Sequence, residues 1–551
     1  FGEQFQAVFC KCSTPATAAG IQKYLGSGLI KGIGPVMAKR IVARFQDETL
    51  EIIESDTKRL LEIEGIGQKR IEMIQRAWQE QKEIREVMLF LQSHGVSAAY
   101  AARIFKTYGQ EAIKVVSDNP YRLATDIFGI GFLTADRIAQ KIGFSKESRF
   151  RVRAGIHYVL NQLADEGHVY FPEDQLRVKC AEVLEVPGEL VWQGLETMAA
   201  ERDIVCEELG SDEGEAHRAV FLAKYHFSET NIARKLQRLI NSPKSIRPVD
   251  VDKALAWVQQ THAMHLAPKQ AEAVKKALQD KVLVITGGPG TGKSFLLDAV
   301  LKIIHRLGSR ILLAAPTGRA AKRMQEATGC KARTIHRLLE FDYKKAGFKK
   351  NEQHPLNCDL LIIDETSMVD TVLMHHLLKA VRLDTTLILV GDVNQLPSVG
   401  AGNVLGDIIA SKAMPVVELT EIFRQARESS IIVNAHLINQ GSFPRLRPRQ
   451  DKLDDFFFMN EEDPEQVLEK IAYMVTDRIP KRFRLHPIRD IQVLSPMNKG
   501  IVGVSNLNTV LQARLNPAGS EISRGGRIFR SGDKVMQIRN NYDKDVYNGD
   551  I

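Results

Sequence analysis

A glycine-rich segment that ends in lysine and serine carries the strongest chemical signal in this 551-residue sequence. It fits the spacing G-x-x-x-x-G-K-S, follows an apolar stretch at 282–285 and precedes a helical pattern. Glycines let the backbone wrap phosphates, the lysine reaches the β- and γ-phosphates, and the serine hydroxyl holds Mg²⁺. The segment therefore predicts a nucleotide-binding P-loop formed by Gly287, Gly288, Pro289, Gly290, Thr291, Gly292, Lys293, Ser294 and Phe295.

Two adjacent acids follow another apolar stretch, at 360–363. Asp364 is placed to hold the Mg²⁺ shell together with Ser294, and Glu365 is placed to take a proton from an attacking water. Two acids at a strand end are often only solvated surface residues, but a preceding P-loop favours the catalytic interpretation. We therefore expect ATP hydrolysis with Lys293, Asp364 and Glu365 as catalytic residues.

Three further polar residues could complete such a site. Gln395 follows an apolar stretch at 387–390 and could sense the γ-phosphate. Arg424 could act as an arginine finger, although an isolated arginine is more often an ordinary surface residue. Gln270 lies at the start of the helical pattern that precedes the P-loop strand.

Apolar strands separated by helices must position these residues. Runs of this kind are typical of a parallel sheet that is covered by helices on both faces, so we expect an α/β domain. The expected strands are 282–285, 310–315, 360–363 and 387–390. Before this domain, residues 150–241 mix helical stretches with short apolar ones, which favours a winged-helix-like unit. The tail from residue 485 looks β-rich and basic, either a solvated face or a nucleic-acid track.

A repeat with the pattern Gly-Ile-Gly followed by a helical stretch occupies the first part of the chain. Its copies contain the glycine pairs Gly32 and Gly34, Gly65 and Gly67, and Gly129 and Gly131, with a weaker copy at Gly95. The first glycines are therefore 33, 30 and 34 residues apart. Glycines permit a tight hairpin with positive φ, and the N–H groups at the start of the following helix can hold a phosphate.

Basic residues such as Lys39 and Lys69 lie early in the helices that leave the first two hairpins. These segments resemble the helix-hairpin-helix motif, which in DNA-binding proteins contacts the backbone without reading sequence. A plain helical packing module is the alternative. The last copy has Phe132 and Leu133 where the second has Gln68 and Lys69, which favours a purely structural role for that copy.

The motor motifs together resemble superfamily 1 helicases of the RecD branch. The likeness rests on APTGRAAKRM, LLIIDETSMVD, GDVNQLPSVG and LTEIFRQA, and the hairpin array is typical of the stand-alone RecD-like form. The resemblance implies a RecA-like motor and adenine reading by Gln270. It also implies DNA contacts by Pro316, Thr317, Gly318, Arg319, Thr334 and His336.

Two later motor motifs of that family do not occur before Ile551, and the stretch 532–542 resembles the family's entry into an SH3-like insert. With Phe1 as the first residue, we expect a fragment that is open at both ends. The expected segments are the end of a β domain at 1–20, the hairpin array at 21–148, the winged-helix-like unit at 149–248, the first RecA-like domain at 249–430, and a partial second RecA-like domain with the start of the insert at 431–551.

Composition sets limits on the class of protein. Lys and Arg total 75 against 67 for Asp and Glu, and this net charge of +8 permits a polyanionic partner. No run of 18 apolar residues occurs, so no membrane span is expected. The six cysteines form no CxxC pair, and no Cys/His cluster has zinc spacing, so we expect mostly reduced thiols in a cytoplasmic protein.

We therefore predict a monomeric DNA helicase that uses ATP and Mg²⁺. By resemblance, it moves 5′ to 3′ on single-stranded DNA and unwinds duplex at single-strand/duplex junctions in repair or recombination. The alternative is a DNA-binding ATPase switch or scaffold that does not unwind, and an RNA-directed motor is less favoured. The basic stretch 341–355, with Lys344, Lys345, Lys349 and Lys350, is either a strand-splitting hairpin or an exposed loop.

Overall fold

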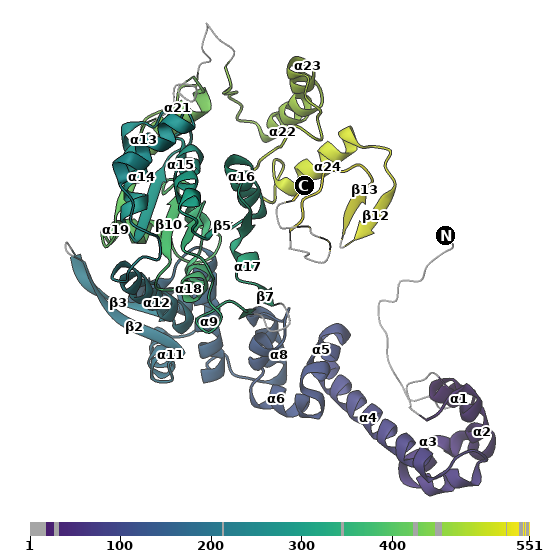
Figure 1. Cartoon of the computed structure of the whole chain (residues 1–551). Helices are drawn as coiled ribbons and strands as arrows, with labels where there is room; N and C mark the ends of the chain where they lie inside the picture. Colours follow the sequence, from purple (N-terminus) through teal and green to yellow (C-terminus); the bar gives the residue numbers. More distant parts are fainter. Residues whose placement is uncertain are drawn as a thin grey trace. The chain divides into compact units, whose positions relative to one another are not determined.

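The computed structural model describes residues 18–26, 32–211, 214–342, 347–421, 428–446, 454–524, 526–538, 544, 546 and 550–551. The chain divides into two compact units. One comprises residues 1–162 and 171–220, and the other comprises residues 163–170 and 221–551. Helical elements dominate the beginning of the chain, and a β-sheet enclosed by helices follows later (Figure 1).

Eight helices, several of them joined by glycine turns, form the first part of the first unit among the described residues. They are α1 (Ala18–Gly26), α2 (Pro35–Phe45), α3 (Thr49–Ser55), α4 (Gln68–Ser93), α5 (Ala98–Tyr108), α6 (Ala112–Asp118), α7 (Arg122–Asp126) and α8 (Phe132–Ile142). The first glycine of every repeat has a φ between 70° and 101°: Gly32, Gly65, Gly95 and Gly129. A residue with a Cβ is strained in that conformation, so the predicted hairpins are confirmed together with the reason for their glycines.

The first two hairpins pack against each other's outgoing helices. A Cβ on Gly32 would lie 3.2 Å from Ile74 Cγ1 in α4, and a Cβ on Gly65 would lie 3.5 Å from Met37 Cε in α2. The third and fourth hairpins repeat this arrangement. Lys141 Nζ in α8 lies 3.5 Å from the carbonyl oxygen of Gly95. The four copies therefore form two pairs.

Six elements follow the array in the order helix, strand, helix, helix, strand, strand. They are α9 (Arg149–Asp165), β1 (Tyr170–Pro172), α10 (Glu173–Leu184), α11 (Gly188–Ala200), β2 (Ile204–Ser211) and β3 (Gly214–Leu222). The strands form one sheet in the order β1-β3-β2. This order of elements and strands is that of a winged helix, which confirms the expected winged-helix-like unit.

A buried ion pair joins α8 of the array to α9. Arg151 Nε lies 2.8 Å from Asp136 Oδ1, and the two side chains are only 6% and 11% exposed. The hydroxyl of Tyr121 also donates to Asp136 Oδ1, at 2.8 Å. Arg151 further donates to the carbonyl oxygens of Lys146 and Leu184. Both charges are therefore satisfied by fixed partners, as burial requires.

The second unit contains a six-stranded parallel sheet in the order β11-β4-β10-β9-β5-β6. Its strands are β4 (Val282–Gly287), β5 (Ile311–Ala315), β6 (Ala332–Thr334), β9 (Leu360–Ile363), β10 (Thr386–Gly391) and β11 (Val416–Leu419). The four predicted strands are confirmed, and so is the RecA-like α/β class. The sequence reasoning missed β6, which has only three residues, and β11, in which an exposed acid interrupts the apolar run.

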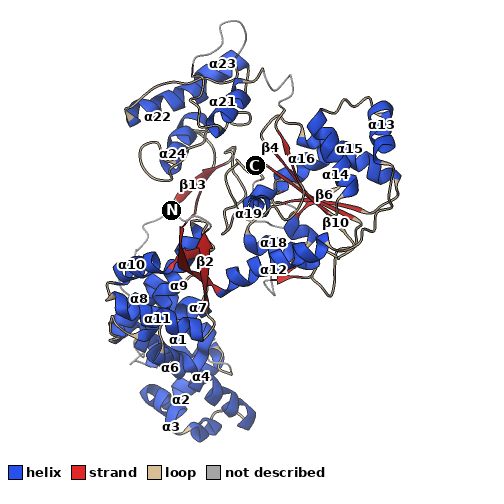
Figure 2. Ribbon diagram, turned by 90° about the vertical axis from the view of Figure 1, so that its left-hand side faces the viewer, coloured by secondary structure: helices blue, strands red, loops and turns tan. Residues whose placement is uncertain are grey.

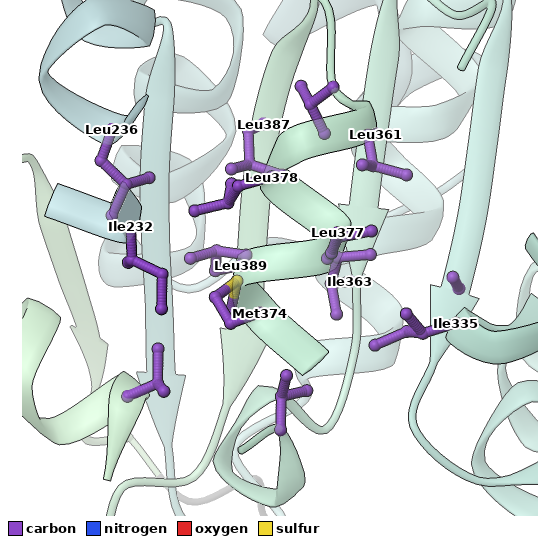
Figure 3. Packing of buried hydrophobic residues seen from close by; sticks show 14 of the residues in the cluster. Ile232, Leu236, Ile335, Leu361, Ile363, Met374, Leu377, Leu378, Leu387 and Leu389 are labelled. Carbon is purple, nitrogen blue, oxygen red and sulfur yellow. The ribbon is translucent and has the colours of Figure 1, made fainter. Parts of the chain in front are cut away.

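Helices cover both faces of this sheet (Figure 2). They are α12 (Ala223–Ile240), α13 (Val251–Thr261), α14 (Pro268–Gln279), α15 (Lys293–Arg306), α16 (Gly318–Thr328), α17 (Ile335–Leu338), α18 (Thr371–Ala380) and α19 (Val404–Ala410). Successive side chains of a strand point to opposite faces, so each strand contributes to two cores. Leu387 and Leu389 pack with α12 and α18 (Figure 3), whereas Ile388 and Val390 pack with the α14 and α15 side.

Helix α12 belongs to the motor core. Its residues Ile232, Leu236 and Leu239 are buried against the sheet, and the compact unit begins at Phe221. The domain boundary predicted at residue 248 was based on the proline-containing linker, which lies after α12. Packing and linker composition therefore divide the chain at different points.

After β11, the described residues form helices, irregular backbone and one antiparallel hairpin. These elements are α21 (Ser430–Asn439), α22 (Pro464–Tyr473), α23 (Ile479–Phe483), α24 (Val504–Leu515), β12 (Glu521–Arg524) and β13 (Arg527–Arg530). An antiparallel strand pair, β7 (Phe341–Asp342) and β8 (Gly347–Phe348), also precedes β9, and Lys344 and Lys345 between these strands lie outside the described residues. In the described part of the tail from residue 485, the two short strands β12 and β13 pair only with each other and the longest element is helix α24, so the expectation of a β-rich tail is wrong for that part. Across the part of the chain that the structure describes, no helix is long and apolar enough to span a membrane.

Candidate nucleotide and DNA sites

The predicted nucleotide-site segments lie at one edge of the sheet. The P-loop continues from the end of β4, the segment 392–397 follows β10, and the two acids follow β9. These three strands are parallel neighbours in the sheet. Carboxyl ends of parallel strands meet at one edge, which is where α/β folds bind ligands.

The P-loop has the backbone that phosphate binding needs. Gly290 and Gly292 have φ angles of 76° and 77°, which favour glycine. Helix α15 begins at Lys293, and its N-cap, Gly292, provides no side-chain cap for the first N–H groups. These groups, with the positive end of the helix dipole, suit an anion. Lys293 Nζ donates to the carbonyl oxygens of Gly287 and Gly288, so the ammonium group already lies over the loop.

Gln270 lies beneath the P-loop and is only 2% exposed. Its Nε2 donates to the carbonyl oxygen of Thr291 at 3.2 Å, and its Oε1 accepts from the backbone N–H of Ala267 at 3.1 Å. The Thr291 hydroxyl in turn donates to the carbonyl oxygen of Gly288 at 2.8 Å. Both ends of the Gln270 amide therefore support the loop, a role that the sequence did not suggest.

The acid pair lies in a partly buried environment. The backbone N–H of Glu365 donates to Asp364 Oδ1 at 2.8 Å, and burial raises the pKa of Asp364. Burial also raises the pKa of Glu365, and the neighbouring charge of Asp364 raises it further. Glu365 Oε2 is buried and has no hydrogen-bond partner among the described residues. An acceptor with an elevated pKa and an unused oxygen is suited to take a proton from water.

The oxygen donors at this edge fit a magnesium ion. Asp364 offers a carboxylate and Ser294 offers a hydroxyl at the start of α15, and Mg²⁺ prefers oxygen ligands. The buried Ser367 hydroxyl and Glu365 Oε2 also lack protein partners in the described part of the chain. The oxygen atoms of Ser294 and Asp364 could hold such an ion.

Two further residues, Gln395 and Arg424, were predicted for the nucleotide site. Gln395 is exposed in the segment after β10, at the edge that carries the P-loop. Its neighbour Asp392 is 2% exposed, and its charge is among the influences that raise the pKa of Glu365. Arg424 lies outside the described residues.

His436 is a residue near the P-loop that sequence reasoning missed. It lies in α21, and its Nε2 is 3.4 Å from the carbonyl oxygen of Pro289. A Cβ on Gly288 would lie 2.7 Å from His436 Cε1, so glycine is also required there by the close ring. No motif surrounds His436, and only the fold brings it to the loop.

The predicted DNA-contact residues of the motor lie at or just after the carboxyl ends of β5 and β6. Thr317 and Thr334 cap the helices α16 and α17, and each hydroxyl accepts a backbone N–H at 3.2 Å. Arg319 is exposed, whereas Pro316 and Gly318 are half-buried.

His336 contributes to the packing beneath the β7–β8 strand pair. Its ring centroid lies 6.0 Å from that of Phe341 and 5.6 Å from that of Phe348, and burial lowers its pKa. Of these predicted DNA-contact residues, Thr317 and Thr334 cap helices and His336 packs against aromatic rings, whereas Arg319 is an exposed cation.

The first two hairpins keep room for a phosphate backbone. Gly34 and Gly67 are the N-caps of α2 and α4, neither caps its helix with a side chain, and no atom lies within 4 Å of a Cβ built on either. Lys39 and Lys69 are exposed on the outgoing helices. In the third hairpin, by contrast, the Ser97 hydroxyl caps α5 by accepting from Tyr100 N at 3.4 Å.

Arg40 and Arg70 donate hydrogen bonds to the second hairpin in addition to carrying positive charge. Arg40 Nη1 donates to the carbonyl oxygen of Glu64 at 3.1 Å, and Arg70 Nη1 donates to that of Gly65 at 2.6 Å. Both acceptors lie in the second hairpin. These arginines therefore help to hold the turn, and the two lysines are the better candidates for phosphate contact.

Comparisons with known proteins agree with this arrangement. The ATP-dependent RecD2 DNA helicase of Deinococcus radiodurans is 33% identical over 534 residues, which cover 95% of this chain and 71% of the relative. This chain belongs to the RecD2 DNA helicase family. The RecBCD enzyme subunit RecD of Mycolicibacterium smegmatis is 31% identical over 51% of this chain and 56% of its own length. The same subunit of Haemophilus influenzae is 36% identical over 26% of this chain and 27% of its own length.

Family profiles assign the parts of this RecD2-family chain. The SAM-like helix-hairpin-helix tandem matches residues 28–80, which contain the first hairpin pair. The ATP-dependent RecD2 DNA helicase HHH domain matches residues 80–170, from α4 through α9. The AAA domain matches residues 270–401, and the ATP-dependent RecD-like DNA helicase SH3 domain matches residues 507–551. The division of the array into two pairs thus agrees with two separate profiles.

Proposed function

We propose that this RecD2-family chain is the ATP-driven motor and the DNA-binding array of a helicase that moves 5′ to 3′ on single-stranded DNA. It opens duplex at single-strand/duplex junctions during repair or recombination. The observation that carries the proposal is the shared sheet edge of the P-loop, the acid pair after β9 and the Asp392 segment after β10. We assign this activity to a monomer that acts in the cytoplasm.

The residues of this edge divide the chemistry of ATP hydrolysis between them. The free N–H groups of the P-loop and the Lys293 ammonium bind the phosphates, and Lys293 exchanges its two carbonyl partners for phosphate oxygens. Glu365 orients the attacking water and takes its proton. Asp364 and Ser294 would hold Mg²⁺, which would supply positive charge to neutralise the phosphates. Gln395 and Arg424 are assigned to γ-phosphate sensing and to stabilising the charge that develops on it.

A motor that moves along DNA must couple ATP hydrolysis to changes in its DNA contacts. The residues for DNA contact should therefore lie near the sheet edge that carries the P-loop and the acid pair. The loops after β5 and β6 leave the same sheet edge, since β5 pairs with β9 and β6 pairs with β5 in parallel. Exposed Arg319 is the motor's candidate phosphate ligand there. The first hairpin pair of the array holds the phosphate backbone independently of sequence, because backbone N–H groups and lysines do not read bases.

A streptavidin-displacement assay tests the direction of movement. Oligonucleotides with biotin at either the 3′ or the 5′ end are incubated with the protein, ATP and Mg²⁺. A 5′-to-3′ motor removes streptavidin from the 3′ end much faster than from the 5′ end, and Lys293→Ala removes neither. Faster release from the 5′ end would reverse the assigned direction. No release with wild-type protein would leave an ATPase switch as the better description.

A further inference from the structure

Phe128 in the fourth hairpin projects from the fold although its neighbours are buried. Its side chain is 91% exposed, whereas Ile127 and Ile130 on either side are 6% and 2% exposed. Burial of a phenylalanine side chain is favourable, and this exposed ring contributes no such stabilisation to the array. The ring is therefore available to a ligand.

The turn that carries Phe128 is well defined. Gly129 has a φ of 87°, and the N–H of Ile130 donates to the carbonyl oxygen of Ile127 at 3.1 Å across the turn. Two buried isoleucines anchor the turn on either side of the ring. The side chain is thus mounted on a rigid hairpin, which lowers the entropy lost when a ligand stacks on it.

Positive charge accompanies the ring. Arg103 Nη1 would lie 3.0 Å from a Cβ on Gly129, the residue next to Phe128. Arg137 is exposed on α8 and donates through Nε to the carbonyl oxygen of Leu133 at 3.3 Å. The nearby acid Asp126 is paired with Arg122 at 3.1 Å, so its charge is balanced locally.

The corresponding positions of the other hairpins carry a different chemistry. The residue directly before the first glycine is Phe128 in the fourth hairpin. In the other three hairpins this residue is Lys31, Glu64 or His94. The expectation that the fourth hairpin has a purely structural role holds for Phe132, which is buried and stacks with Tyr121. It does not explain the exposed Phe128 or the 57% exposed Leu133 on the same hairpin.

We propose that Phe128 is a stacking site for an unpaired base of single-stranded DNA, with Arg103 and Arg137 as ligands for the flanking phosphates. This inference rests on the proposed function. One ring is far too small for a protein interface, which needs about 800 Å² from each partner. It does match the area of one base, and aromatic rings among cations are the common platform of single-strand binding.

The test compares a single-stranded oligonucleotide with the same oligonucleotide made abasic throughout its central part. Phe128→Ala should weaken binding of the normal oligonucleotide by about 5- to 150-fold, the range expected for one stacked base. It should leave binding of the abasic one nearly unchanged, because no base is present to stack. Phe128→Trp should restore the preference for the normal oligonucleotide. Leu89→Ala, which removes a 54% exposed side chain from α4, is the matched control.

The outcomes separate this inference from the proposed function. If Phe128→Ala binds both oligonucleotides as wild type does, the stacking site is wrong while the helicase assignment stands. Equal losses on both oligonucleotides would indicate a structural role for the ring and would also overturn the stacking site. If wild-type protein fails to bind single-stranded DNA at all, the proposed function fails as well. Circular dichroism confirms that each variant is folded.

Discussion

The side-chain amide of Gln270 donates a hydrogen bond to the carbonyl oxygen of Thr291, 3.2 Å away in the P-loop. The Gln270 oxygen accepts a second bond from the helix start at Ala267, so the buried amide links α14 to the phosphate-binding loop. By family resemblance, Gln270 would read adenine. In the structure, its geometry supports the loop that holds the phosphates, and a role in positioning follows from these contacts.

A change of Gln270 to Ala should therefore weaken nucleotide binding without changing base preference. The variant loses both bonds of the amide, and loss of the one bond that reaches the P-loop costs about 1 kcal/mol, or roughly 5-fold in affinity. Gln270→Glu should be worse, because a carboxylate cannot donate to the Thr291 carbonyl. Titrations with ATP and GTP analogues check this prediction. A loss confined to ATP would show that Gln270 reads adenine instead.

Glu365→Gln should abolish hydrolysis while ATP still binds. The amide keeps the size of the side chain but cannot accept the proton, and loss of a general base lowers kcat by about 10²- to 10⁴-fold. Asp364→Asn should in addition weaken the response to Mg²⁺. Nucleotide affinity and turnover are measured against Mg²⁺ concentration in both variants. Equal loss of nucleotide affinity in the two would contradict their separate roles.

The pH dependence of turnover should report the environment of Glu365. Burial, and then the charge of Asp364, raise the pKa of Glu365 above its ordinary value of 4.5. Because the carboxylate must be deprotonated to act as a base, kcat should fall on acidification at a higher pH than for an ordinary glutamate. The measurement is kcat against pH at saturating ATP. A kcat that stays level down to pH values near the ordinary pKa would argue against Glu365 as the base.

Asp136→Ala should destabilise the first unit strongly. It leaves the buried Arg151 guanidinium without its carboxylate, and such a loss costs about 3–5 kcal/mol. The matched control is Arg122→Ala, which breaks the exposed ion pair between Arg122 and Asp126. This change should lower the free energy of unfolding by only about 0–1 kcal/mol. Urea unfolding of both variants provides the comparison. Similar losses of stability in the two variants would mean that the buried ion pair contributes no more to stability than the exposed one.

Replacement of Lys39 and Lys69 together by Ala should flatten the salt dependence of DNA binding. Each phosphate contact contributes about 0.9 to the slope of log affinity against log salt, so the slope should fall by roughly 2. Arg40 and Arg70 are left in place because they hold hairpin carbonyls. Lys58 and Lys106, exposed elsewhere in the array, form the control pair. An unchanged slope would make the first hairpin pair a structural spacer.

Local patterns were sufficient for much of the fold. The buried strands β4, β9 and β10 could be predicted because two covered faces require continuous apolar runs. The hairpins could be predicted because Gly32 and its counterparts must adopt positive φ. Short strands such as β6 carry too few residues to stand out from neighbouring loops.

Contacts between distant residues could not be predicted in the same way. His436 approaches the P-loop from α21, and Arg151 pairs with Asp136 across two helices. Neither residue belongs to a recognisable motif. The support that Gln270 gives to Thr291 was also hidden, because spacing identifies a residue type but not its hydrogen-bond partner.

A strand-displacement assay measures whether this RecD2-family chain unwinds duplex DNA. Duplexes with a 5′ single-stranded tail, a 3′ tail or blunt ends are incubated with the protein, and release of the labelled strand is followed with ATP and Mg²⁺. We expect release from the 5′-tailed duplex only, and no release by Glu365→Gln. ATP hydrolysis that is stimulated by single-stranded DNA but releases no strand from any duplex would contradict the helicase assignment.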